Sequence, residues 1–199
     1  MAIDQVHDLQ QVYRKILNSI SRPGVIANLH DQASGIDYQL PCYDATLLTT
    51  MMLFDGEVTF HVISEHKRSI QEKISAYTLA TYAPLHEADY IIVLEDAKES
   101  SIIQALDQCK KGNLINPQDS STLIFESKTA LSNEVQLLLT GPGISYQNHL
   151  QTSFTKSVWL ARNECIKEYP LGVDVVLTDA KLQVACIPRT TKVALLEVE

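Results

Sequence analysis

The first part of the chain carries a regular helical pattern of apolar residues. One face is apolar at six positions with i, i+3, i+4, i+7, i+8 and i+11 spacing: Leu9, Val12, Tyr13, Ile16, Leu17 and Ile20. The helix is predicted to end before Arg22, because Pro23 disfavours helical geometry at the preceding residue and Gly24 permits a left-handed turn. The pattern therefore predicts an amphipathic helix that closes in a turn.

Helical patterns and short apolar runs then alternate along the chain. Further helices are predicted from Asp44 as N-cap to Phe54, from Ser64 through Tyr77, and over Ile102–Cys109 and Phe154–Cys165. Strands are predicted at Val25–Leu29, Val58–Val62, Tyr90–Leu94, Thr122–Phe125 and Val135–Leu139, and a loop at His30–Leu40. This alternation predicts an α/β three-layer sandwich with a mixed sheet. No composition break interrupts residues 1–199, so we assign a single domain.

A β-hairpin is predicted near the C-terminus. The apolar runs Val173–Thr178 and Leu182–Ile187 are separated by the short turn Asp179-Ala180-Lys181. After Asp174, the first run is apolar at nearly every position, as in a strand that is covered on both faces. Pro188 cannot donate a hydrogen bond to a sheet, so the second strand is predicted to end at Ile187.

The residues after this hairpin are candidates for contact with a ligand or partner. Arg189, Thr190 and Thr191 stand at the strand exit, where they could meet an anion or a partner carboxylate. The alternative for Arg189 is an ion pair with one of the chain's own carboxylates. Arg22, at the end of the first helix, is also a candidate contact for an anion or a partner, with a solvated turn residue as its alternative.

A Gly-Pro-Gly turn follows the strand predicted at Val135–Leu139. Gly141 and Gly143 would let backbone amides approach an anion, which makes them candidate contacts. However, Pro142 lacks an N–H group and no Lys-Ser/Thr pair follows, so the segment is no Walker A loop. A structural turn is the favoured interpretation.

Charge and composition exclude several classes of function. The net charge of −8 argues against nucleic acid or an anionic membrane as a partner. Residues 1–5 lack the pattern of a signal peptide, and the apolar runs are too short for a membrane span, so we expect a cytoplasmic protein.

The four cysteines are far apart and the six histidines show no ligand spacing, so we expect free thiols and no metal. Ser145 and His149 stand four residues apart, but no glycine precedes the serine at nucleophile-elbow spacing, so a coincidence of spacing is favoured over a hydrolase dyad.

Four segments, taken in order, resemble the family of H subunits of the bacterial carbon–phosphorus lyase core complex. They are Tyr13-Arg14-Lys15-Ile16-Leu17 leading to Ser21-Arg22-Pro23-Gly24, then Leu139–Ile144, Tyr169–Asp174 and Ile187–Thr191. The resemblance runs from about Tyr13 to Val193. It departs from the usual family pattern at Tyr13 and Tyr169, where phenylalanine is more usual, and at Asn18-Ser19-Ile20.

The resemblance implies a fold and a function. Such proteins resemble pyridoxal-phosphate-dependent transferases in fold but lack that cofactor, so none is expected. They form homodimers alone and join the G, I and J subunits in a cytosolic complex. With the L subunit, this complex displaces adenine from ATP with an alkylphosphonate, giving ribose 1-alkylphosphonate 5-triphosphate. The I subunit acts as the nucleosidase, and iron–sulfur chemistry of the J subunit later breaks the carbon–phosphorus bond.

On this basis the chain is expected to be an accessory subunit of α-D-ribose 1-methylphosphonate 5-triphosphate synthase, a transferase, and to be non-catalytic by itself. No catalytic residue is carried over from the family. The alternative is a free-standing enzyme or small-ligand-binding protein that retains a nucleotide or pyridoxal-phosphate pocket.

Overall fold

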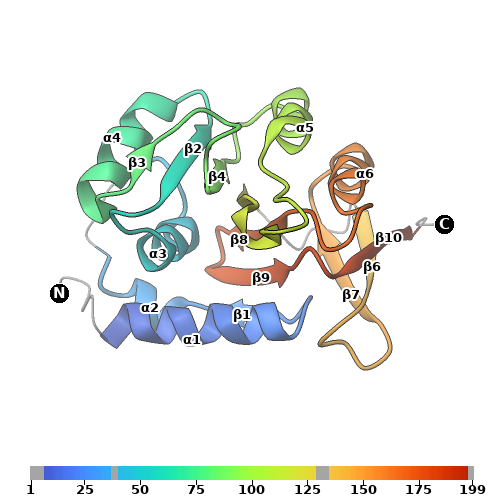
Figure 1. Ribbon diagram of the computed structural model, residues 1–199. Helices are drawn as coiled ribbons and strands as arrows, with labels where there is room; N and C mark the ends of the chain where they lie inside the picture. Colours follow the sequence, from blue (N-terminus) through green and yellow to red (C-terminus); the bar gives the residue numbers. More distant parts are fainter. Residues whose placement is uncertain (1–6, 37–39, 129–134, 197–199) are drawn as a thin grey trace.

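A seven-stranded mixed sheet forms the centre of the molecule (Figure 1). The computed structural model describes residues 7–36, 40–128 and 135–196. The strand order is β1-β9-β8-β5-β4-β2-β3, with β8, β5, β4, β2 and β3 parallel and β9 antiparallel to both its neighbours. Its strands are β1 (Ala27–Asn28), β2 (Thr59–Ile63), β3 (Thr81–Tyr82), β4 (Tyr90–Val93), β5 (Thr122–Ser127), β8 (Asp174–Asp179) and β9 (Gln183–Ile187). The predicted mixed α/β sheet is confirmed.

A smaller antiparallel sheet packs against one face of the main sheet. Its strand order is β10-β6-β7, and its strands are β6 (Val135–Thr140), β7 (Asn148–Thr152) and β10 (Lys192–Leu196). Leu137 and Leu139 of β6 are fully buried and join the core that packs on one face of the main sheet. The second sheet therefore covers the first instead of extending it.

Helices lie on both faces of the main sheet. One face is covered by α1 (His7–Ser21), α3 (Asp44–Leu53) and α4 (Lys67–Thr78), the other by α5 (Glu99–Gln108) and α6 (Lys156–Cys165) together with the small sheet (Figure 1). Strand β4 contributes to both cores, because alternate residues of a strand face opposite sides of the sheet. Ile91 packs into the core with Ile102 of α5, whereas Ile92 packs into the core with Ile70 and Ile74 of α4.

The C-terminal hairpin is confirmed. Val176 pairs with Cys186 in the antiparallel β8–β9 ladder, and β9 ends at Ile187, directly before Pro188. The described elements establish an α/β fold with a mixed sheet. The more specific likeness to pyridoxal-phosphate transferases stays a prediction.

Some local predictions were wrong. The predicted loop His30–Leu40 contains a short helix, α2 (His30–Ala33), while residues 37–39 lie outside the described ranges. Asp44 is the first residue of α3 and not its N-cap, a position that Tyr43 occupies. The helix predicted from Ser64 starts at Lys67, because the Ser64 hydroxyl donates to Asp96 Oδ2 at 2.9 Å and accepts from the backbone N–H of His66.

Three strands and one 3₁₀ turn were not predicted. They are β3, β7, β10 and η1 (Pro117–Asp119). Residues 1–5, which were predicted to carry no signal peptide, lie outside the described ranges. None of the helices within the described ranges combines the length and hydrophobicity that a membrane span needs.

Candidate functional site

The sequence segments that carry the family resemblance meet at one edge of the fold. The backbone at Gly141 (φ +137°) and Gly143 (φ +81°) is in a region that favours glycine. A Cβ atom at Gly141 would lie 2.9 Å from the carbonyl oxygen of Thr190, and one at Gly143 would collide with the carbonyl oxygen of Ser21. The Gly-Pro-Gly turn therefore packs between the end of α1 and the exit of β9.

A second set of contacts ties the same segments together. The side-chain amide of Asn148 donates to the carbonyl oxygen of Pro23 at 3.0 Å, and the backbone N–H of Gly24 donates to the carbonyl oxygen of Cys186 at 3.3 Å. Strand β7 and strand β9 thus hold the turn after α1 from two sides. Because the glycines are needed for close backbone approach, their positions have a structural explanation that involves no anion.

Arg189 uses its donors within the chain. Its Nη2 donates to Asp174 Oδ2 at 2.8 Å, its backbone N–H donates to Asp174 Oδ1 at 2.7 Å, and its Nη1 donates to the carbonyl oxygen of Pro117. Only 18% of the Arg189 side chain is exposed. The alternative in which Arg189 pairs with a carboxylate of the chain is therefore observed. Contact of Arg189 with a ligand stays a prediction.

A buried arginine that the sequence analysis missed holds the segment Pro188–Thr191 in place. Arg162 of α6 has no exposed surface and donates from Nη1 to Thr191 at 2.8 Å and from Nη2 to Pro188 at 2.7 Å, in both cases to the carbonyl oxygen. Burial lowers the pKa of the guanidinium to about 10. Arg162 stands four residues after the buried Val158, so helical spacing was the signal that could have found it.

The remaining candidates differ in exposure. Arg22 is exposed, and within the described ranges its side chain forms no ion pair. Thr190 is half-buried, whereas Thr191 is fully buried. Of the predicted contacts, Arg22 and Thr190 therefore have the side chains most accessible to a partner.

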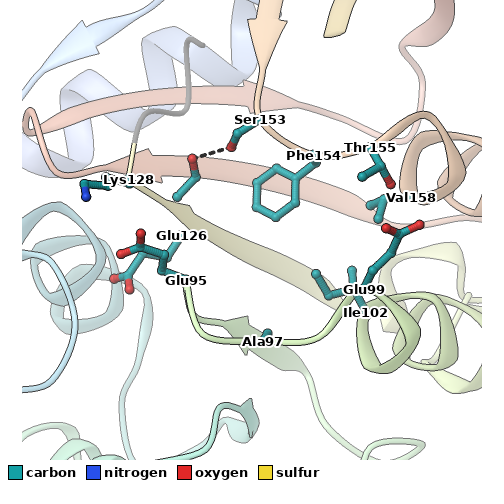
Figure 2. Close-up of a pocket in the computed structure, with 11 residues that line it drawn as sticks. Glu95, Ala97, Glu99, Ile102, Glu126, Lys128, Ser153, Phe154, Thr155 and Val158 are labelled. Atoms are coloured by element: carbon teal, nitrogen blue, oxygen red, sulfur yellow. Dashed lines mark hydrogen bonds between the residues drawn. The ribbon is translucent and has the colours of Figure 1, made fainter. Parts of the chain in front are cut away.

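A different region, at the carboxyl ends of β4 and β5, forms a cavity of about 410 Å³ (Figure 2). Glu95 follows β4, Glu126 and Ser127 are the last two residues of β5, and Ser153 and Phe154 follow β7. A second hollow of about 590 Å³ adjoins it and shares Glu95 and Glu126. None of these residues was a sequence candidate.

Glu126 and Glu95 form a carboxylate pair between the two hollows, and we call the pair and both hollows the carboxylate cleft. Glu126 is only 3% exposed, and its Oε2 accepts a hydrogen bond from the backbone N–H of Tyr43 at 2.7 Å. Burial raises the pKa of Glu126, and hydrogen bonds from the Thr46 side chain and from the backbone of Tyr43 and Glu95 offset part of this rise. The charge of Glu95 adds a smaller upward contribution to the pKa of Glu126. The Tyr43 hydroxyl donates to Glu95 Oε2, and burial together with this contact raises the pKa of Tyr43 to about 12.

The cavity also has an aromatic wall and a hydroxyl pair. The rings of Phe154 and Phe125 lie 4.8 Å apart, which holds Phe154 against the core while it lines the cavity. The hydroxyls of Ser127 and Ser153 share a hydrogen bond of 2.5 Å (Figure 2). Across the described residues, no group of three or more His, Cys, Asp or Glu side chains could hold a metal ion.

Comparison with known proteins decides the family. The model of the family described as bacterial phosphonate metabolism protein (PhnH) matches residues 2–194. This chain belongs to that family. The matched range contains all four resemblance segments and every residue that lines the carboxylate cleft.

Two curated relatives of this chain match almost its whole length. "Alpha-D-ribose 1-methylphosphonate 5-triphosphate synthase subunit PhnH" of Rhizobium meliloti (strain 1021) is 28% identical over 193 residues, which are 95% of this chain and 92% of the relative. "Putative C-P lyase subunit protein HtxG" of Stutzerimonas stutzeri is 26% identical over 187 residues, 94% of this chain and 86% of the relative. Both relatives bear names of subunits.

Proposed function

We propose that this chain is an accessory subunit of the bacterial carbon–phosphorus lyase system. In this role it acts in the cytoplasm with the G, I and J subunits. Together with the L subunit, it supports conversion of ATP and an alkylphosphonate to ribose 1-alkylphosphonate 5-triphosphate and adenine. The observation that carries the proposal is the PhnH family match over residues 2–194, and the subunit names of both relatives support it.

The outer face of α1 is suited to a subunit contact. Tyr13, Leu17 and Ile20 are 51%, 49% and 42% exposed, and their spacing places them along one side of the helix. Val12 and Ile16, on the adjacent side, are buried. The apolar pattern of α1 thus divides into a core face and a face in solvent, and exposed apolar patches commonly mark protein interfaces.

This outer face adjoins further apolar surface. Ile20 also lines a hollow of about 230 Å³ together with Leu53 and Pro188, and Arg22 follows at the end of the helix. We assign the face, Tyr13 with Leu17 and Ile20, to contact with another subunit of the complex. When the chain is alone, a second copy is expected to occupy it.

A second candidate function is a free-standing protein that binds a small ligand. The observation that favours it is the carboxylate cleft, whose two hollows are the size of small-molecule sites. Such a protein would bind its ligand without any partner subunit. Retained pyridoxal phosphate would colour the purified protein, and we expect a colourless one.

A growth experiment tests the proposed function. The gene for this chain is deleted from a host that uses methylphosphonate as its sole phosphorus source, and growth is compared with that of the restored strain. We expect the deletion strain to grow on inorganic phosphate and to fail on methylphosphonate. Undiminished growth on methylphosphonate would overturn the proposal.

A further inference from the structure

The second hollow of the carboxylate cleft lies where open α/β sheets bind ligands, and the first hollow adjoins it at the carboxyl ends of β4 and β5. In such sheets, ligands bind outside the carboxyl ends of parallel strands, at the point where the chain reverses its direction across the sheet. From β2 the chain passes through α4 to β3, toward one edge of the sheet. From β4 it passes through α5 to β5, toward the opposite edge. The reversal falls between the neighbouring strands β2 and β4, and the loop after β4 carries Glu95.

Two of the loops at this reversal are held in place by polar contacts. Asp96 Oδ2, after β4, accepts hydrogen bonds from the Ser64 hydroxyl at 2.9 Å and from the backbone N–H of Glu65 at 2.8 Å. The loop after β2 is thereby fixed to the loop after β4. Asp96 and His66 line the second hollow beside Glu95 and Glu126, so this hollow opens directly at the reversal.

The carboxylates in the cleft lack a basic partner within the described part of the chain. Neither Glu95 nor Glu126 forms an ion pair with any of those residues. Burying a carboxylate without a cation costs free energy unless hydrogen-bond donors reach it. Tyr43 supplies a donor to each carboxylate, and Glu126 is also hydrogen-bonded by the Thr46 side chain and the backbone of Glu95. Both carboxylate side chains still line open space. A ligand that brings further O–H or N–H donors would satisfy them.

The rest of the lining indicates which kind of ligand fits. Phe154, Ile102 and Val158 give the cavity an apolar wall, and Figure 2 shows Glu95 and Glu126 beside one another at one end of it. A carboxylate pair disfavours an anionic group at that end, because like charges repel. The one lysine of the lining, Lys128, is exposed and forms no ion pair with either carboxylate. The arrangement suits a neutral molecule with neighbouring hydroxyls at one end and a flat ring at the other.

We propose that this cleft binds a nucleoside, with Glu95 and Glu126 accepting hydrogen bonds from the ribose hydroxyls and Phe154 lying against the base. Carboxylates bind ribose hydroxyls at the equivalent strand ends of dinucleotide-binding folds, and aromatic rings stack on bases. The choice of a ribosyl ligand over other hydroxylated rings rests on the proposed function, since one relative is named for a ribose phosphonate synthase.

Calorimetric titration with adenosine tests this site, on the purified chain and on its complex with the other subunits. We expect saturable binding that is at least tenfold weaker in the Glu126→Gln and Phe154→Leu variants. The matched control is Glu65→Gln, which also removes one negative charge but lies outside both hollows and should bind as the wild type does.

A ligand-side comparison needs no variant. 2′,3′-Dideoxyadenosine lacks the hydroxyls that the carboxylates would accept from, so it should bind at least tenfold more weakly than adenosine. Equal affinity for the two nucleosides, or no binding of adenosine to either preparation, would overturn the inference. The growth test above uses no nucleoside, so success there combined with failure here would reject the nucleoside site alone.

Discussion

Arg189 and Asp174 join the end of β9 to the start of β8 through two hydrogen bonds. The guanidinium contributes one at 2.8 Å, and the backbone N–H of Arg189 contributes the other at 2.7 Å. The two residues come from separate segments of the family resemblance, Tyr169–Asp174 and Ile187–Thr191. The pair gives Arg189 and Asp174 a structural role in this chain, whatever else they contact.

The Arg189–Asp174 pair should therefore contribute to stability. We expect Arg189→Ala to lower the free energy of unfolding by about 1–3 kcal/mol, because it leaves a partly buried carboxylate without its charged partner. Urea denaturation measures the change. Arg22→Ala, at an exposed arginine, is the control and should stay within about 0.5 kcal/mol of the wild type. Equal stability of the two variants would contradict the structural role.

Gly143 should tolerate no side chain. Its φ of +81° strains an L-residue, and the new Cβ would collide with the carbonyl oxygen of Ser21. We expect Gly143→Ala to cost about 1–3 kcal/mol, which lowers the melting temperature by several degrees. Gly56→Ala is the matched control, because its Cβ would meet only Leu79 at 3.7 Å, an ordinary contact. A similar melting temperature for both variants would show that the turn is more adaptable than its contacts indicate.

Glu126 should make stability depend on pH. Burial raises its pKa in the folded protein, so the folded state holds this proton more tightly than the unfolded chain does. The stability that this proton contributes to the folded state is fully present below the ordinary glutamate pKa of about 4.5. This stability is lost as the pH rises through the raised pKa of Glu126. Glu126→Gln keeps an acceptor for the Tyr43 N–H and is always neutral. It should be at least as stable as the wild type at pH 7, with a smaller loss of stability on going from acid to neutral pH.

Thermal melting across this pH range checks that prediction, with Glu65→Gln as an exposed control. A Glu126→Gln variant that melts well below the wild type at pH 7 would mean that the ionised carboxylate stabilises the fold. If the variant is stable as expected, its loss of adenosine binding cannot be attributed to unfolding.

The outer face of α1 should be needed for assembly and not for folding. We expect Leu17→Glu to reduce recovery of partner subunits at least tenfold while leaving the melting temperature nearly unchanged, because Leu17 is 49% exposed. Gln11→Glu adds the same charge to an exposed position on another side of the helix and should assemble normally. Normal assembly of the Leu17 variant would place the subunit contact elsewhere on the chain.

Much of the main sheet was predictable, because its strands have short apolar runs and its helices have regular apolar spacing. Strand β7 was not, since only Leu150 and Thr152 of its five residues are buried. It forms by pairing with β6, where Leu150 lies opposite Leu137. Strand β10 likewise pairs with β6, about fifty residues earlier in the sequence. Long-range pairing of this kind overrides local propensity and leaves little trace in a single sequence.

The cleft was harder to predict than the fold. Tyr43, Glu95, Glu126 and Phe154 are ordinary residues in separate segments, and only the order of the parallel strands brings them together. One signal was available, since Glu95 and Glu126 each follow closely on a predicted apolar strand. Acidic residues at the carboxyl ends of neighbouring parallel strands share one edge of the sheet, but strand order had to be known first.

The most direct test of the central claim is a tagged pull-down of this chain, co-expressed with its G, I and J counterparts and sized by native mass spectrometry. The proposed function predicts a stoichiometric complex that contains all four subunits. Recovery of this chain as a lone monomer or homodimer, with none of the other subunits, would contradict it and favour the free-standing ligand-binding protein.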